Sequence, residues 1–230
     1  MSDAGYTGYE NLEVMREAVN YNRMLIELVQ AHARQGERVL DFGAGVGTFA
    51  LPMRRDGYAV ECVELDDAQR SALAAHGLPV HRTLADIGDQ SVDYVYTLNV
   101  LEHIDEDIGV LRDIGRTLRV HGTLLVYVPA FPVLFTSMDL RVGHLRRYTR
   151  RDLRDKVAAA GFDVIAAEYV DSLGFLATLV YRFAGPDTGS IDRGALRAYD
   201  RYVFPVSRGL DRAFKRIMGK NVLLVARKRS

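Results

Sequence analysis

The sequence has few of the residues that hold disulfide-rich or zinc-dependent folds together. It contains one cysteine, Cys62, and no tryptophan in 230 residues. A single thiol cannot close an internal disulfide, and it matches no zinc-binding spacing. Because Cys62 lies in an apolar run, we expect a buried core thiol in a reducing compartment and no metal site.

The chain also lacks excess charge and long apolar runs. Its 30 basic and 30 acidic residues cancel, which gives no support to nucleic acid as a partner. No apolar stretch approaches the ~20 residues that span a bilayer, and the N-terminus does not resemble a secretory signal. With 48% hydrophobic residues, the chain can bury a full core. We therefore expect a globular cytoplasmic protein that can still touch a membrane surface.

Segments typical of strands and helices alternate along the chain. Strands are expected at 34–45 (running into a glycine-rich turn), 58–66, 91–100, 123–130, 162–170 and 221–228. Helices are expected at 11–34, 46–57, 67–77, 105–122 and 149–161. This alternation predicts an α/β fold with a mostly parallel, doubly wound sheet and helices on both faces.

Residues 172–220 do not fit the repeat. They hold an apolar stretch at 173–185, a loop at 185–190, and a long basic segment at 192–219 that Pro205 should break or kink. A basic amphipathic helix can sit on an anionic membrane, or it can simply pack on the core with a solvated outer face. We expect three parts: an N-terminal helical lid at 1–34, a core at 35–171 and 221–230, and a helical insertion at 172–220.

A glycine-rich loop follows the first expected strand. Gly43, Gly45 and Gly47 alternate there, and Thr48 stands where a dinucleotide-binding loop needs its third glycine. Glu64 ends the second strand, at the edge where doubly wound folds bind ligands and at a distance that suits ribose hydroxyls. Together these features indicate an adenosine-containing ligand, with a spacing that disfavours NAD.

At this point the sequence resembles the class I S-adenosylmethionine-dependent methyltransferases. The motifs that carry the likeness are "VLDFGAGVGTFA" at 39–50, "VECVELD" at 60–66, "SVDYVYTLNVLEHI" at 91–104 and "LRDIGRTLRVHGTLLVYVP" at 111–129. The resemblance implies a three-layer Rossmann-like fold with seven strands, the last antiparallel and preceded by the helical insertion. It implies a methyltransferase that uses S-adenosyl-L-methionine as its cofactor, and it does not identify the methyl acceptor.

The resemblance also implies a set of cofactor contacts. The glycine loop would meet the methionine part, Glu64 the ribose and Asp86 the adenine, while Asn99 and Leu101 would lie beside the sulfonium. Tyr21 is either a lid over the cofactor or a core residue of an amphipathic helix. The full expected set is Asp41, Gly43, Ala44, Gly45, Gly47, Glu64, Leu65, Asp86, Asn99, Val100, Leu101 and Tyr21.

The expected acceptor site lies beyond the fourth and fifth strands. His103 is a candidate general base, or else a histidine that orders its loop. His144 and Tyr148 are further catalytic candidates in the loop at 139–153. Arg146 and Arg147 are candidate substrate-binding residues, because basic side chains at a helix N-terminus oppose its dipole and should face an anion, either a protein carboxylate or a substrate.

The pattern "GHLRRYT" is also similar to one in methyltransferases of glycan or lipid-linked sugar biosynthesis. We therefore expect O-methylation of a small or lipid-linked acceptor, with anionic molecules and glycans as the candidates. The alternatives are a non-catalytic S-adenosylmethionine-binding protein and, less favoured, an NAD-type oxidoreductase. The sequence does not indicate which oligomeric state the protein adopts.

Overall fold

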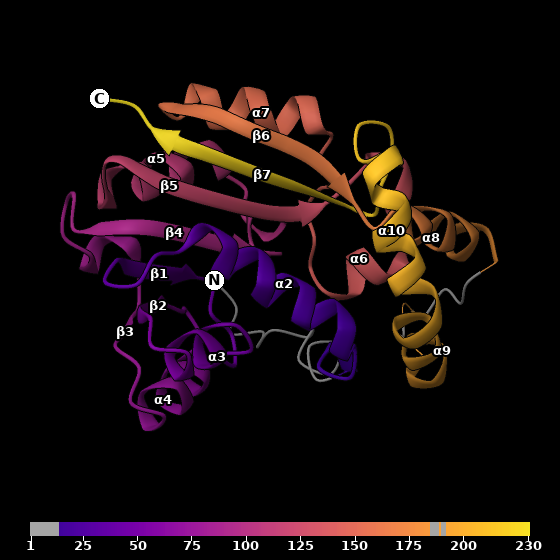
Figure 1. Cartoon of the computed structure of the whole chain (residues 1–230), viewed down its shortest axis with the longest axis horizontal. Helices are drawn as coiled ribbons and strands as arrows, with labels where there is room; N and C mark the ends of the chain where they lie inside the picture. The colour runs from indigo at the N-terminus through magenta and orange to yellow at the C-terminus, as the bar shows by residue number, and fades with distance from the viewer. Residues whose placement is uncertain (1–13, 185–188, 190–191) are drawn as a thin grey trace.

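A computed structural model describes residues 14–184, 189 and 192–230. Its centre is a seven-stranded sheet in the order β3-β2-β1-β4-β5-β7-β6 (Figure 1). Neighbouring strands are parallel, except that β7 runs antiparallel to both β5 and β6. The strands are β1 (Arg38–Phe42), β2 (Ala59–Val63), β3 (Val80–His81), β4 (Val92–Leu98), β5 (Leu118–Pro129), β6 (Phe162–Val170) and β7 (Asn221–Lys228). The expected Rossmann-like fold with an antiparallel last strand is confirmed.

Helices cover both faces of the sheet. The α-helices are α2 (Val19–His32), α3 (Ala50–Arg55), α4 (Asp67–Ala75), α5 (Asp107–Thr117), α6 (Ser137–Arg141), α7 (Arg150–Ala159), α8 (Ser172–Ala184), α9 (Arg193–Ala198) and α10 (Phe204–Phe214). Leu111 of α5 and Val157 of α7 are buried in the core on one face. Leu25 of α2 and Met53 of α3 are buried in the core on the other.

The central strand β4 shows why the sheet is buried on both sides. Val95 packs into the core beneath α5 and α7, whereas Tyr94, Tyr96 and Leu98 pack into the core beneath α2 and α3. Side chains alternate between the faces of a strand, so a strand covered on both sides is apolar at nearly every position. Cys62 of β2 is buried and free, as expected.

Several predicted boundaries were wrong. The helix expected over 46–57 begins only at Ala50, because the preceding residues form the glycine loop. The helix expected over 105–122 ends at Thr117, and the next residues already belong to β5. Val92 pairs with Leu118 and Tyr94 with Thr123, so β5 carries extra residues in a bulge that sequence periodicity reads as helix. Strand β3, two residues long, was missed.

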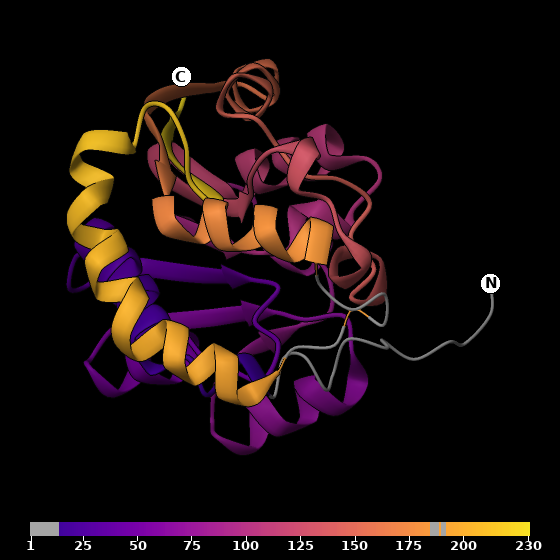
Figure 2. The ribbon, with the colours of Figure 1, turned by 90° about the vertical axis from the view of Figure 1, so that its right-hand side faces the viewer.

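The helices of the insertion gather at the end of the sheet where the parallel strands finish (Figures 1 and 2). Pro205 lies in the first turn of α10, directly after a π-helical turn, η4 (Tyr199–Val203). The Asp211 carboxylate accepts the N–H groups of Asp171 and Ser172, both at 2.8 Å, and so holds the start of α8 against α10. Within the described residues, no helix combines the length and apolar character needed to cross a bilayer.

Helix α2, expected as a lid, is fixed to this insertion from far away in the sequence. The helix spans Val19–His32, shorter than the 11–34 expected, and residues 11–13 lie outside the described chain. The buried Asp200 accepts the backbone N–H groups of Asn20 at 2.9 Å and Tyr21 at 2.8 Å. These are first-turn donors that have no partner inside the helix, so a carboxylate of η4 satisfies the start of α2.

Candidate active site

The glycine loop joins β1 to α3 and is held by backbone contacts. Gly43, Gly45 and Gly47 have φ angles of +82°, +56° and +81°, which other residues adopt only with strain. The N–H groups of Gly43 and Ala44 both donate to the carbonyl oxygen of Val63, at 2.9 and 3.2 Å. The end of β2 therefore fixes the start of the loop.

Glu64 connects this loop to the end of β2. Its Oε2 accepts the N–H of Gly45 at 2.7 Å, and its Oε1 accepts the N–H of Asp66 at 3.0 Å. A Cβ added at Gly45 would meet only Gln69 Oε1, at 3.5 Å, so a ligand can approach the backbone closely there. Leu65, beside Glu64, is 68% exposed. An open backbone next to a carboxylate and an exposed apolar side chain fits an adenosine-containing ligand.

Asp41 lies beneath the loop at the end of β1. Its side chain is buried and accepts a hydrogen bond from the Tyr96 hydroxyl at 2.9 Å. Burial raises the pKa of Asp41 to about 7, and the negative charge of Glu64 adds to the effect, while the Tyr96 hydrogen bond opposes it. The carboxyl group is therefore close to its titration point at neutral pH, and a nearby cation would favour its ionised form.

The remaining expected cofactor residues lie on three other elements. Asp86 ends the short helix η1 (Leu84–Asp86), and its Oδ2 accepts the N–H of Thr83 at 2.9 Å. Asn99 has a φ of +55° and donates its N–H to the carbonyl oxygen of Tyr127 at 2.8 Å. Val100 follows it, and Leu101, which is fully buried, begins the short helix η2 (Leu101–His103).

Tyr21 reaches the end of β4 from helix α2. Its ring packs edge-on against Phe204 and Tyr127, with ring centres 5.6 and 6.3 Å apart. Burial raises the pKa of Tyr21 to about 12, and hydrogen bonding with Tyr127 and Asn99 partly opposes this rise. The Tyr21 hydroxyl thus lies beside Asn99, although the two residues are far apart in the sequence.

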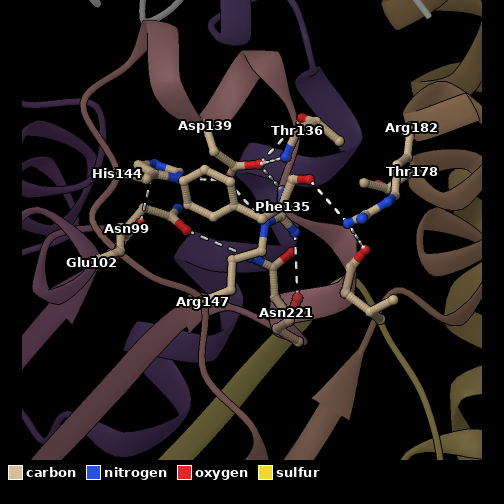
Figure 3. A network of polar contacts seen from close by, with 12 residues as sticks. Asn99, Glu102, Phe135, Thr136, Asp139, His144, Arg147, Thr178, Arg182 and Asn221 are labelled. Atoms are coloured by element: carbon tan, nitrogen blue, oxygen red, sulfur yellow. Dashed lines mark hydrogen bonds and ion pairs between the residues drawn. The ribbon is translucent and has the colours of Figure 1, made fainter.

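A second cluster of polar side chains lies near Asn99, between η2 and the loop that follows β5 (Figure 3). His144 Nδ1 lies 2.7 Å from Asp139 Oδ1, and its Nε2 lies 3.7 Å from Glu102 Oε1. The His103 and His144 rings meet edge to face, with centres 4.7 Å apart. His103 Nδ1 faces the carbonyl oxygen of Gly143 at 3.2 Å.

The two buried carboxyl groups of this cluster differ in their partners. Arg147 donates two hydrogen bonds of 2.9 Å each to Asp139. Burial opposes ionisation of Asp139, but His144 and Arg147 outweigh it and lower its pKa to about 2. Glu102 is completely buried, and burial raises its pKa to about 8 although Arg147 opposes the rise. Burial, reinforced by His144, lowers the pKa of His103 to about 4.

The other two acceptor-side candidates face protein carboxylates. Arg146 pairs with Asp105 at 3.1 Å and Asp107 at 3.3 Å. Tyr148 is fully buried, and its hydroxyl lies 3.0 Å from the Leu101 carbonyl oxygen and 2.9 Å from Asp107 Oδ2. The expected conflict with the helix dipole is therefore met by aspartates of this chain. The sequence candidates omit Glu102, although it stands inside the motif "NVLEHI" beside His103.

The chain is similar in sequence to known methyltransferases. A family model described as a methyltransferase domain matches residues 13–167. The chain is 29% identical over 162 residues to a probable S-adenosylmethionine-dependent methyltransferase of Mycolicibacterium smegmatis, covering 67% of this chain and 61% of that protein. It is 32% identical over 143 residues to an uncharacterized methyltransferase of Staphylococcus carnosus, covering 60% and 67%. The match thus spans less than two thirds of the first relative.

Solved structures share the fold at low sequence identity. A putative methyltransferase in complex with the Trm112 activator, from Haloferax volcanii, aligns with a TM-score of 0.66, 17% identity and full coverage of both chains. The [4+2]-cyclase SpnF aligns with a TM-score of 0.61 and 20% identity, covering 90% of this chain and 81% of that one. Because one of these proteins is named as a cyclase, the fold alone does not fix the reaction.

Proposed function

The chain belongs to the family of S-adenosylmethionine-dependent methyltransferase domains, and from this premise we propose that the protein is an O-methyltransferase with a small or lipid-linked acceptor. The observation that supports an oxygen acceptor is the cluster of His103, His144 and Asp139, which lies close to Asn99 in the folded chain (Figure 3). S-adenosylmethionine supplies a methyl group already activated on a sulfonium, so the protein mainly has to hold the acceptor in line with it. A hydroxyl acceptor must also lose a proton, and the imidazoles are the groups suited to promote that loss.

Each element that ends at this edge of the sheet would contact a different part of the cofactor. Gly43–Gly47 would receive the methionine part, with Asp41 below to balance its ammonium group. Glu64 would hold the ribose hydroxyls, exchanging its bond to Gly45 (2.7 Å) for bonds to the ligand. Asp86 and Leu65 would flank the adenine, and Asn99–Leu101 would lie beside the sulfonium with Tyr21 above them.

The acceptor half of the proposal rests on His103 and His144. With a pKa lowered to about 4, His103 is neutral at physiological pH and keeps a lone pair. Asp139 fixes the ring of His144 through Nδ1, which directs Nε2 toward Glu102. We assign Tyr148 a positioning part, because its buried hydroxyl supports the carbonyl of Leu101.

The two arginines fit a supporting role better than direct substrate binding. Arg147 is buried and fully engaged with Asp139, and Arg146 is paired with Asp105 and Asp107. These pairs weaken the argument that the acceptor must be anionic. A neutral hydroxylated acceptor, such as a glycan, needs no guanidinium clamp.

A lipid-linked acceptor is supported by the surface of the insertion. Exposed apolar side chains lie on α8 and on the segment from η4 to the residues after α10, namely Leu176, Val180, Phe183, Tyr202, Val206, Leu210 and Ile217. Basic residues are interleaved with those of α10. Such a surface can lie on an anionic membrane. In sedimentation with anionic vesicles, Phe183→Ser should reduce binding, whereas Ile165→Ser, at another exposed apolar site on β6, should not.

The direct test is a screen for acceptor-dependent formation of S-adenosylhomocysteine with small glycans, phosphates, carboxylic acids and lipid-linked sugars. With an active acceptor, His144→Ala should lower turnover by about 10²–10⁴-fold, as expected for loss of proton-transfer assistance. Its affinity for S-adenosylmethionine should stay unchanged. The exposed His76→Ala serves as a control, and equal turnover in both variants would remove His144 from the acceptor site.

A further inference from the structure

We propose that Glu102, His103 and His144 bind a divalent transition-metal cation beside the methyl-transfer site. The inference deepens the proposed function and rests on it, since it states how the two imidazoles would activate the acceptor. Sequence spacing gave no sign of this site, because two of the ligands are adjacent and the third comes from a loop 41 residues later. Folding brings them together through the contacts between η2 and residues 143–145.

Glu102 is the residue that most requires a cation. Its side chain is completely buried, and within the described chain neither carboxylate oxygen has a hydrogen-bond partner in another residue. Its charged neighbours are Arg147 and Asp139, with His144 Nε2 3.7 Å from its Oε1, and Arg147 already forms two hydrogen bonds with Asp139. Two carboxylates therefore share one guanidinium. A buried carboxylate without a hydrogen-bond partner is costly, and buried carboxylates are usually paired or bound to a metal.

Both histidines are oriented as metal ligands commonly are. A histidine that binds a metal through one ring nitrogen usually donates the N–H of the other to a carboxylate or a backbone carbonyl. His144 Nδ1 faces Asp139 Oδ1 at 2.7 Å, and His103 Nδ1 faces the Gly143 carbonyl oxygen at 3.2 Å. The Gly143 carbonyl oxygen and the Asp139 carboxylate both act as acceptors here, which puts the N–H of each ring on Nδ1 and makes Nε2 the ligand atom.

The distances suit a single ion. One ligand atom from each of the three residues lies within 4.8 Å of the other two. With metal–ligand bonds of about 2.0–2.2 Å, two ligands of one ion are at most roughly 4.4 Å apart, so closure requires movements of only some tenths of an ångström. His144 Nε2 and Glu102 Oε1, 3.7 Å apart, already meet this limit.

The ligand types select the class of ion. Two imidazoles and one carboxylate suit Mn²⁺, Fe²⁺, Co²⁺ or Zn²⁺ better than Mg²⁺ or Ca²⁺, which prefer oxygen ligands. Three protein ligands leave positions open for an acceptor oxygen. A hydroxyl that binds there becomes more acidic and releases its proton to solvent water. Its oxygen then bonds to the methyl carbon as the carbon–sulfur bond breaks, and the sulfur keeps that electron pair.

The test uses Mn²⁺ binding to the metal-stripped protein, measured by electron paramagnetic resonance without any acceptor. We expect one Mn²⁺ per chain, with affinity reduced at least about 100-fold in the isosteric Glu102→Gln variant, more than is usual for loss of a supporting residue. His81→Ala is the matched control, because His81 also faces a glutamate, Glu61, at 3.0 Å. Its affinity should equal that of the wild type.

Two outcomes would overturn the site: no stoichiometric Mn²⁺ binding by the wild type, or unchanged binding by Glu102→Gln. Thermal unfolding with and without Mn²⁺ guards against a folding defect, since the ion should raise the midpoint of the wild type and of His81→Ala but not that of Glu102→Gln. Failure of the proposed function gives a different pattern. Mn²⁺ would still bind, and no hydroxylated acceptor would yield S-adenosylhomocysteine.

Discussion

Replacing Gly43 by alanine tests how the glycine loop is held against the end of β4. Gly43 has a φ of +82°, and an added Cβ would overlap Val100 Cγ2 and lie 2.9 Å from Val100 Cγ1. The left-handed backbone costs an L-residue about 1–2 kcal/mol, and the overlap adds about 1–3 kcal/mol. Because Val100 is only half-buried and can shift, we expect a total loss of about 2–4 kcal/mol in the free energy of unfolding.

Two further variants separate these causes. Gly36 has a similar φ of +88° with nothing within 4 Å of an added Cβ, so Gly36→Ala should show the backbone cost alone. Adding Val100→Ala to Gly43→Ala removes the overlapping atoms and should restore about 1–3 kcal/mol relative to additive effects. Urea unfolding at pH 7 measures all of them. If Gly43→Ala cost no more than Gly36→Ala, or if the double variant were simply additive, the contact with Val100 would not hold the loop.

The remaining predictions concern Asp41, Asp200 and Tyr148. With a pKa raised to about 7, Asp41 binds its proton more tightly in the folded state. Its contribution to stability is therefore full below about pH 4 and is lost as pH rises through about 7, by roughly 4 kcal/mol at 1.4 kcal/mol per pH unit. Asp41→Asn should abolish that share of the pH dependence in urea unfolding, and identical wild-type and variant profiles would contradict it. Asp200→Ala should lower the free energy of unfolding by about 1–2 kcal/mol, as is usual for a lost helix cap. It should also weaken S-adenosylmethionine binding, measured by calorimetry, because Tyr21 is then held less firmly. An unchanged affinity would show that α2 does not contribute to the cofactor site. Tyr148→Phe should lower the free energy of unfolding by about 1–3 kcal/mol, because Asp107 and the Leu101 carbonyl lose a buried donor, and an unchanged urea midpoint would refute this.

The parts of the fold that local sequence determines could be predicted. The alternation of apolar strands with helices indicated the doubly wound sheet, and the glycine loop with Glu64 indicated the family. The bulge in β5 could not be predicted, because it depends on how Tyr94 pairs with Thr123 across strands. Strand β3, formed by Val80–His81, is too short for periodicity to reveal.

The candidate site divides in the same way. Its cofactor half follows largely from motifs, since most of the expected residues lie at or just after the end of a strand; Tyr21 on α2 and Asp86 on η1 are the exceptions. Its acceptor half depends on contacts between segments that are distant in the chain. A single sequence does not show which of these segments meet. The sequence makes Arg147 a candidate substrate ligand because it does not show that Asp139 lies beside it in the fold. It does not show that Glu102 meets His144, which comes from another loop. Asp200 supports α2 from 180 residues away.

The proposed methyl transfer requires the cofactor's sulfur to face the cluster of Glu102, His103 and His144. A crystal structure of the full chain with S-adenosylhomocysteine tests it most directly. We expect the ribose hydroxyls on the Glu64 carboxylate, the methionine part along Gly43–Gly47, and the sulfur directed past Asn99 toward the two imidazoles. A sulfur directed away from His103 and His144, or a ribose that does not touch Glu64, would contradict the account.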